Sequence, residues 1–213
     1  MPGETSLCAV PGLALVGWIV FGVIALAGRI LLQLRRTGST GVSGISGSFG
    51  SVEWLGGVLF ALSLLAGGIA PVLQLTDVIE PIDALDNTAV RIAGLVLYGI
   101  GLAVCVGAQL AMGASWRIGV DESERTDLVT DGPFGIVRNP IYSGVIPLVA
   151  GLALLAPNAL SVAAFAALIT ALEIQVRLVE EPHLLRAHDP AYREYASRVG
   201  RFVPGVGLLR ERS

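Results

Sequence analysis

The hydrophobic positions of this chain lie in long uninterrupted runs, without the one-sided periodicity of helices that cover a soluble core. Three runs have about the twenty residues that a helix needs to cross a bilayer. They cover Ala9 to Gly28, Trp54 to Leu75, and Ile92 to Met112. Each of them predicts a transmembrane helix. The first predicts a retained helix and not a signal peptide, because its arginines follow the apolar run.

Two shorter apolar runs follow in the second half of the chain. Ile141 to Ala156 contains Pro147 and is short for a full span, and Ala159 to Leu172 is shorter still. Pro157-Asn158 between them predicts a tight turn. The pair therefore predicts a helical hairpin, whose second helix continues out of the hydrocarbon as a charged extension at least to Glu181.

The composition agrees with a membrane protein. Hydrophobic residues make up 54% of the 213 residues, charged residues make up 15%, and the mean hydropathy is +0.74. The chain is therefore predicted to be an all-α integral membrane protein of about five transmembrane helices, with a C-terminal helical hairpin. All fourteen basic residues are arginine, which excludes lysine chemistry such as a Schiff base or a P-loop.

The arginines also predict the orientation. With five spans, one side holds the first loop, the third loop and the C-terminal tail, and these segments contain nearly all the loop arginines. The opposite side holds the N-terminus, an acidic second loop and the Pro157-Asn158 turn. By the positive-inside rule the N-terminus is expected outside and the C-terminus in the cytoplasm. The arginines counted on the cytoplasmic side are Arg35, Arg36, Arg117, Arg125, Arg138, Arg186, Arg193, Arg198, Arg201, Arg210 and Arg212.

The chain divides into two predicted parts. Residues 1–112 form a three-helix scaffold that includes a glycine-rich loop at 37–51. Residues 113–213 form a region that carries the candidate chemistry. The glycine at every third position between Gly38 and Gly50 is interpreted as a flexible linker, because a phosphate-binding loop would need a lysine and a preceding strand.

The first candidate site is the segment Val129 to Gly144, where a polar loop meets a hydrophobic run. Pro140 predicts a helix that begins at or just after it. The start of a helix presents unpaired N–H groups, which with Arg138 beside them suit an anionic or zwitterionic ligand. The alternative is a glycine-rich helix start whose arginine contacts lipid phosphate.

The second candidate site lies at the end of the last hydrophobic run. Glu173, Arg177 and Glu181 are spaced four residues apart and would form one charged stripe on a continuous helix, with Glu180 on nearly the same face. The alternative is a ladder of interfacial ion pairs. We favour a ligand pocket, because charges so close to a bilayer are costly unless they face a bundle interior or a wet cavity.

No metal site is expected. Cys8 and Cys105 are far apart in the sequence, and His183 and His188 are five residues apart, which does not match the spacing of a helical metal pair.

The order of four motifs resembles the isoprenylcysteine carboxyl methyltransferase family, which is related to the phospholipid N-methyltransferases. The motifs are R-N-P-x-Y-x-G from Arg138, E-E-P from Glu180, Y-x-E-Y-x-x-R-V from Tyr192, and a final Pro-Gly. The resemblance covers about residues 113 to 207. Asn139 stands where the family commonly has histidine, and its amide can still donate and accept hydrogen bonds. Together with the orientation, the resemblance implies a cytoplasmic cofactor pocket.

The resemblance implies methyl transfer from S-adenosyl-L-methionine to a lipophilic acceptor that enters from the bilayer. We expect Arg138 to align the acceptor and Glu181 to be the second catalytic group, although either glutamate of the pair could face the cofactor. The expected partners are a lipophilic or prenylated substrate and membrane lipids, with no nucleic acid. The expected cofactor-binding residues are Gly132, Asn139, Pro140, Tyr142, Glu180, Tyr192 and Arg198.

Three alternatives to carboxyl methylation remain open. The acceptor could be the amine of a phospholipid. The chain could also be a membrane reductase of the sterol reductase type, which would require NADPH in place of S-adenosylmethionine. A non-enzymatic membrane protein such as a transporter is the third alternative, but no repeated or interrupted helices indicate one.

Overall fold

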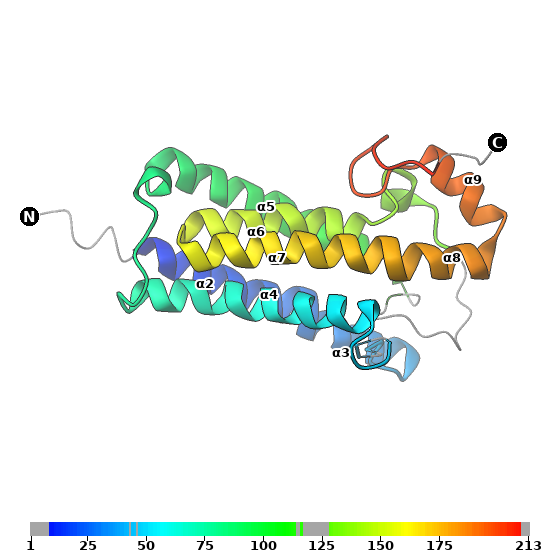
Figure 1. Cartoon of the computed structure of the whole chain (residues 1–213), viewed down its shortest axis with the longest axis horizontal. Helices are drawn as coiled ribbons and strands as arrows, with labels where there is room; N and C mark the ends of the chain where they lie inside the picture. Colours follow the sequence, from blue (N-terminus) through cyan, green and yellow to red (C-terminus); the bar gives the residue numbers. More distant parts are fainter. Residues whose placement is uncertain (1–8, 43, 46, 114–115, 117–127, 210–213) are drawn as a thin grey trace, which may run out of the picture.

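The computed structural model describes the chain except residues 1–8, 43, 46, 114–115, 117–127 and 210–213 (Figure 1). The described residues form helices and no strand. In chain order they are α2 (Ala9–Phe21), η1 (Gly22–Gly28), α3 (Arg29–Thr37), α4 (Val52–Leu75), η2 (Asp83–Leu85), α5 (Thr88–Ala111), η4 (Gly132–Gly135), α6 (Pro140–Leu155), α7 (Ala159–Ile174), η5 (Gln175–Glu180), α8 (Glu181–His188) and α9 (Ala191–Arg198).

The all-α membrane architecture predicted from the hydrophobic runs is confirmed. Four continuous helices among the described residues are long and apolar enough to cross a membrane: Val10–Thr37, Val52–Leu75, Thr88–Ala111 and Ala159–His188. The fifth predicted helix, α6, has sixteen residues and is about 24 Å long at 1.5 Å per residue, which is short of the hydrocarbon thickness. As expected, α6 and α7 form a hairpin that turns at Pro157 and Asn158.

The first helix is longer than its apolar run predicts. It does not end at Gly28 but continues as α3 to Thr37, where Gly38 caps it in a left-handed conformation. The segment η1 within it is π-helical. The carbonyl of Ala25 in this segment accepts a hydrogen bond of 2.9 Å from the side chain of Gln109 on α5. A π-helical turn therefore docks the first helix on the third.

The continuation of the first helix buries Arg29. Its guanidinium donates to the side chain of Gln33 and to the backbone carbonyl of Gly113, and it lies 4.6 Å from the centre of the Trp116 ring. The Trp116 side chain is itself buried. The contact between the Arg29 guanidinium and the Trp116 ring joins the N-terminal helix to the segment that follows α5.

Helices α5 and α6 run antiparallel with their backbones in contact. Gly94 on α5 faces Gly151 on α6, and Gly101 faces Gly144. A β-carbon at any of these four positions would clash with the backbone of the partner helix. Small residues allow such close approach in membrane helices, which here brings the start of α6 next to the end of α5.

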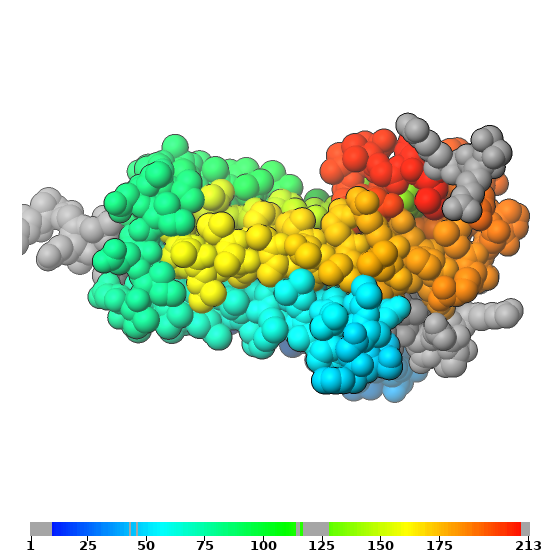
Figure 2. Space-filling model, in the orientation of Figure 1, coloured from blue at the N-terminus to red at the C-terminus, as the bar shows by residue number. Residues whose placement is uncertain are grey.

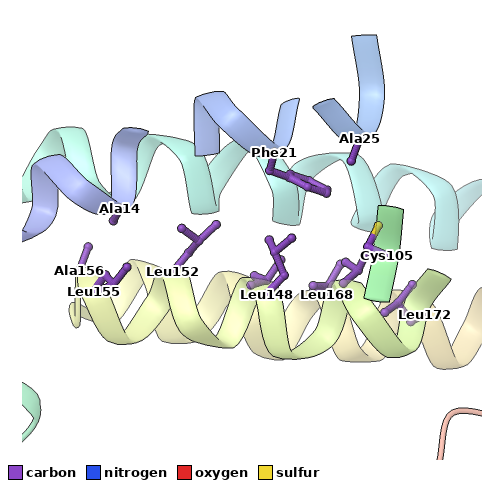
Figure 3. Close-up of a cluster of buried hydrophobic side chains, with 12 residues drawn as sticks. Ala14, Phe21, Ala25, Cys105, Leu148, Leu152, Leu155, Ala156, Leu168 and Leu172 are labelled. Carbon is purple, nitrogen blue, oxygen red and sulfur yellow. The ribbon is translucent and has the colours of Figure 1, made fainter. Parts of the chain in front are cut away.

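The apolar core lies between these helices and the first one. Phe21 from α2 points toward Leu148 and Leu152 of α6, and Leu168 and Leu172 of α7 belong to the same buried cluster (Figure 3). The core is shared by residues from both halves of the chain. The functional division at residues 112 and 113 stays a prediction.

The described segments that carry the candidate site gather at one end of the bundle. Helices α3, α8 and α9 and the C-terminal tail lie at the right of Figure 1, while the α4–α5 connection and the α6–α7 turn lie at the left. Figure 2 shows the tail in red against the orange surface of α8 and α9 at the same end. The first loop and the C-terminal tail therefore lie at the same end of the bundle, and the second loop and the α6–α7 turn lie at the opposite end, as predicted. Arg117, Arg125, Arg210 and Arg212 of the orientation argument lie outside the described residues.

Glycine recurs at every third residue of the glycine-rich loop at 37–51 because the backbone is left-handed at these positions. Every third residue from Gly38 to Gly50 is a glycine, and all five have φ between +70° and +86°, the left-handed region that other residues rarely adopt. The linker interpretation of this segment stays a prediction.

Candidate functional site

The site is built where the start of α6 meets the C-terminal tail. Helix α6 begins at Pro140, as predicted. The residues before it pair with the tail: the amide of Arg138 donates to the carbonyl of Gly200 at 2.8 Å, and the amide of Asn139 donates to the carbonyl of Arg201 at 3.1 Å. The side chain of Ser143 donates to the carbonyl of Phe202. Two polar segments about sixty residues apart in the sequence thus form one unit.

The Arg138 side chain holds this unit together. Nη1 donates to the carbonyls of Ala196 and Val199, at 2.9 and 2.6 Å, and Nη2 donates to the Glu181 carboxylate at 2.7 Å and to the carbonyl of Gly207 at 2.9 Å. All four Nη hydrogens are therefore used, and only 2% of the side chain is exposed. In this conformation Arg138 offers no Nη–H group to an acceptor. It positions the tail against α8.

Glu181 is the shared partner of two arginines. Its Oε1 accepts from Arg138 and from Nε of Arg201, both at 2.7 Å, and its Oε2 accepts from Nη2 of Arg201 at 2.9 Å. The pairing with Arg201 is bidentate, the geometry that gives charge-assisted hydrogen bonds their strength. The hydrogen bonds that Arg201 donates to Glu181 raise the pKa of the Arg201 guanidinium, which stays charged. Glu181 is thus neutralised within the protein.

Glu180 has a different environment, although it is the neighbouring residue. Its Oε1 accepts a hydrogen bond of 2.8 Å from the hydroxyl of Tyr142 on α6, and Gln175 is its other side-chain partner. Both partners are uncharged. The three arginines Arg138, Arg177 and Arg201 pair with other carboxylates.

The π-helical segment η5 separates the two environments. We expected Glu173, Arg177 and Glu181 to share one stripe of a continuous α-helix. The structure corrects this, because π-helical turns hold an extra residue and rotate everything that follows. Glu173 and Arg177 pair with each other on the exposed side, while Glu181 points inward at Arg138. The turn also brings Gln175 to Glu180 five residues later.

Arg138, Glu180, Glu181 and Arg201 form a polar cluster near the start of α6, and helix α9 adds two tyrosines to this cluster. Tyr192 and Tyr195 are buried, with ring centres 6.1 Å apart. The Tyr195 hydroxyl donates to the carbonyl of Phe134 in η4 at 2.6 Å, and burial raises the pKa of Tyr195 to about 12. Burial, reinforced by the negative charge of Glu181, raises the pKa of Tyr192 as well. Both hydroxyls therefore remain protonated at neutral pH.

Two predicted cofactor-binding residues are not brought into the cluster. Arg198 lies on the outer face of α9, where it pairs with Glu194 and is 71% exposed. Gly132 is exposed and has a φ of +59°, which accounts for the glycine there. Asn139, Pro140, Tyr142, Glu180 and Tyr192 do lie at the junction of α6, η5 and α9.

Sequence reasoning missed Arg201. We had counted it only as one of the tail arginines that predict orientation. The signal near it was the glycine at 200, because a β-carbon there would clash with the tail backbone at Val203, Gly205 and Val206. A turn this tight folds Arg201 back onto Glu181.

Among the described residues, no group of three or more histidine, cysteine, aspartate and glutamate side chains is arranged to hold a metal. The chemistry of the cluster instead lies in two adjacent carboxylates of unequal environment. One is neutralised by two guanidinium groups, and the other is held by the neutral side chains of Tyr142 and Gln175.

Comparisons with known proteins agree with the resemblance found in the motifs. Residues 89–190 match the phospholipid methyltransferase family, a segment that contains α5, α6, α7, η5 and α8. It therefore includes both Arg138 and the two adjacent glutamates.

Two individual proteins are similar over larger parts of the chain. The nickel-cobalt-cadmium resistance protein NccN of Alcaligenes xylosoxydans xylosoxydans is 29% identical over 129 residues, which is 60% of this chain and 58% of NccN. The fold resembles that of the eukaryotic intramembrane Ras methyltransferase ICMT, an isoprenylcysteine carboxyl methyltransferase, with a TM-score of 0.59 and 18% identity over 85% of this chain and 62% of ICMT. The chain thus spans about three fifths of the length of each.

Proposed function

We propose that this chain, whose residues 89–190 match the phospholipid methyltransferase family, is an integral membrane methyltransferase that uses S-adenosyl-L-methionine and acts on a lipophilic acceptor. The observation that carries the proposal is the contrast between the two adjacent glutamates. Glu181 is neutralised by Arg138 and Arg201, whereas Glu180 is held only by neutral donors.

A carboxylate held in this way suits a cation. Glu180 is half-buried at the end of a membrane-spanning helix, where an unneutralised charge is costly unless a ligand or a wet cavity compensates it. S-adenosyl-L-methionine would bring a cationic sulfonium, a cationic amino group, and a methyl group that the sulfonium activates. The residues present therefore fit this cofactor. Tyr142 fixes the orientation of the Glu180 carboxylate, and the first amides of α6 are hydrogen-bond donors beside it.

The remaining residues of the cluster act by positioning. Methyl transfer to a carboxylate needs little proton transfer, so alignment of the two reactants accounts for most of the rate. Arg138 and Glu181 hold the tail against α8, and Tyr195 holds α9 against η4. This arrangement keeps Tyr192 and Glu180 in place near the start of α6. We assign Glu180 and Tyr142 to the cofactor and regard Arg138 and Glu181 as positioning residues.

The acceptor class follows from the membrane location. A substrate that enters between helices must be lipophilic, and the two acceptors suggested by the related proteins are a prenylated cysteine carboxylate and a phospholipid amine. The metal resistance in the name of NccN is a property of that protein.

Titration calorimetry on the purified protein tests the proposal. We expect S-adenosylmethionine and its demethylated product to bind with dissociation constants on the order of micromolar, typical of a site with several polar contacts. NADPH, titrated in parallel, is expected to give no binding heat. Binding of NADPH together with no binding of either sulfur compound would assign the chain to the reductases instead.

A further inference from the structure

The arginines around the cluster differ in how many of their donors are still available. Arg138 uses all four of its Nη hydrogens on protein acceptors. Arg177 and Arg198 lie on exposed helix faces, and each is paired with a glutamate four residues before it. None of these three presents a fixed, unused guanidinium edge toward the cluster.

Arg201 does present such an edge. Its Nε and Nη2 are fixed on the two oxygens of Glu181, and its side chain is 12% exposed. Within the described residues Nη1 donates no hydrogen bond, and it is not among the buried nitrogens that lack a partner. Nη1 can therefore be reached from outside the protein, and the bidentate pair fixes its direction in advance.

A glycine lies beside this donor. A β-carbon at Gly207 would come within 3.1 Å of Nη1 of Arg201. Gly207 has a φ of +75°, so its backbone also requires glycine. The consequence is that no side chain at this position covers Nη1.

The charges of the cluster point to a ligand of negative sign. Arg138 and Arg201 bring two positive charges to Glu181, which brings one negative charge. The next carboxylate that acts on Arg201 is that of Glu173, which already pairs with Arg177, so the trio itself has one positive charge in excess. Buried ion pairs are favourable only when the charges are balanced and hydrogen-bonded. An oxyanion at Nη1 would balance the trio while leaving Glu180 to a cation.

We propose that Nη1 of Arg201 binds an oxyanion of the ligand, either the carboxylate or phosphate of the lipophilic acceptor or the carboxylate of the cofactor. This inference rests on the proposed function and gives it a specificity residue. Arg201 would receive the negative group of the ligand at one side of the start of α6, and Glu180 would receive the positive group at the other.

Three ligand pairs test the assignment, because the members of each pair differ by the group that carries the oxyanion. The first pair is S-farnesylcysteine, which has a free carboxylate, and its methyl ester. The second pair is dioleoylphosphatidylethanolamine and dioleoylglycerol. The third pair is S-adenosylhomocysteine and methylthioadenosine. Affinities are measured by calorimetry in detergent for the wild-type protein, Arg201→Gln and Arg201→Lys. Arg193→Gln is the matched control, because Arg193 is an exposed tail arginine paired with Asp189.

We expect Arg201→Gln to weaken the oxyanion member of one pair roughly ten- to hundredfold, the range for a lost charge-assisted hydrogen bond, and to leave its counterpart unchanged. The pair that responds identifies the source of the oxyanion. A purely structural role for Arg201 would weaken both members equally. Equal loss within every pair, no loss in any pair, or the same selective loss in Arg193→Gln overturns the inference.

Arg201→Lys tests the inference even if the glutamine variant fails to fold. Lysine keeps a positive charge next to Glu181 but has no planar fork, so it cannot hold Glu181 with two donors and still present a third. We expect this variant to elute as the folded protein in size-exclusion chromatography and to show the same selective loss. Full oxyanion affinity in the folded lysine variant contradicts the inference. Failure of the wild-type protein to bind S-adenosylmethionine or S-adenosylhomocysteine rejects the proposed function, whereas the two lipid pairs still report on Arg201.

Discussion

Glu180 and Glu181 are adjacent in the chain, yet they have different partners and are expected to respond differently to the same substitution. In Glu180→Gln the partners Tyr142 and Gln175 remain, because both are neutral. We expect this variant to keep its thermal stability and to lose about 1 to 3 kcal/mol of S-adenosylmethionine binding, the cost of a charged hydrogen bond. Calorimetry and a thermal unfolding assay in detergent measure the two effects separately.

Glu181→Gln is the matched comparison. This substitution leaves Arg138 and Arg201 without their counter-charge. Both guanidinium groups are largely buried, because the Arg138 side chain is 2% exposed and the Arg201 side chain is 12% exposed. We expect a loss of unfolding free energy of about 3 to 5 kcal/mol, because removing one partner of a buried ion pair leaves the other uncompensated. If Glu181→Gln proves as stable as the wild-type protein while its cofactor binding is lost, the roles of the two glutamates are the reverse of those assigned here.

The contact between α5 and α6 shows how single elements place the site. Gly101 allows the backbones to touch at the level of Gly144, and this contact sets the position of the start of α6 relative to the rest of the bundle. Gly101→Ala would drive its β-carbon into the backbone of Leu148. We expect a destabilisation of about 1 to 3 kcal/mol, typical of overpacking, in thermal unfolding in detergent.

Gly99→Ala is the control for this contact. Gly99 is on the same helix two residues earlier, and a β-carbon there would meet nothing within 4 Å. The variant is expected to be neutral, or to gain up to about 1 kcal/mol from the better helix propensity of alanine. Equal destabilisation by both alanines would mean that close packing of α5 on α6 is not what the glycine at 101 provides.

At the scale of the whole molecule, the distribution of loops over the two ends predicts the orientation in the membrane. Asp83 lies in the connection between α4 and α5, and Ser197 lies in α9 near the other end of the bundle (Figure 1). Single cysteines at these positions, in a protein without Cys8 and Cys105, should react with a membrane-impermeant maleimide from opposite sides. The positive-inside rule places Ser197 on the cytoplasmic side. Reaction of both positions from the same side would reject the five-helix topology.

The sequence by itself determined most of the helices and the order of the motifs that contain the candidate site. Hydropathy runs and proline positions are local properties, so the hairpin at Pro157 and Asn158 and the start of α6 at Pro140 could be predicted to within a residue or two. The order of the motifs also predicted the family resemblance, because that order is carried by the chain itself.

Only the tertiary structure decided which side chains meet. The π-helical turn at Gln175–Glu180 rotates Glu181 toward Arg138, and an α-helical reading of the spacing cannot predict that rotation. The tail folds back through the tight turn at Gly200, which brings in Arg201 and leaves Arg198 at the surface. Both outcomes depend on contacts between segments at least twenty residues apart. A local pattern records the type and spacing of side chains, whereas their direction is set by the packing of distant backbone.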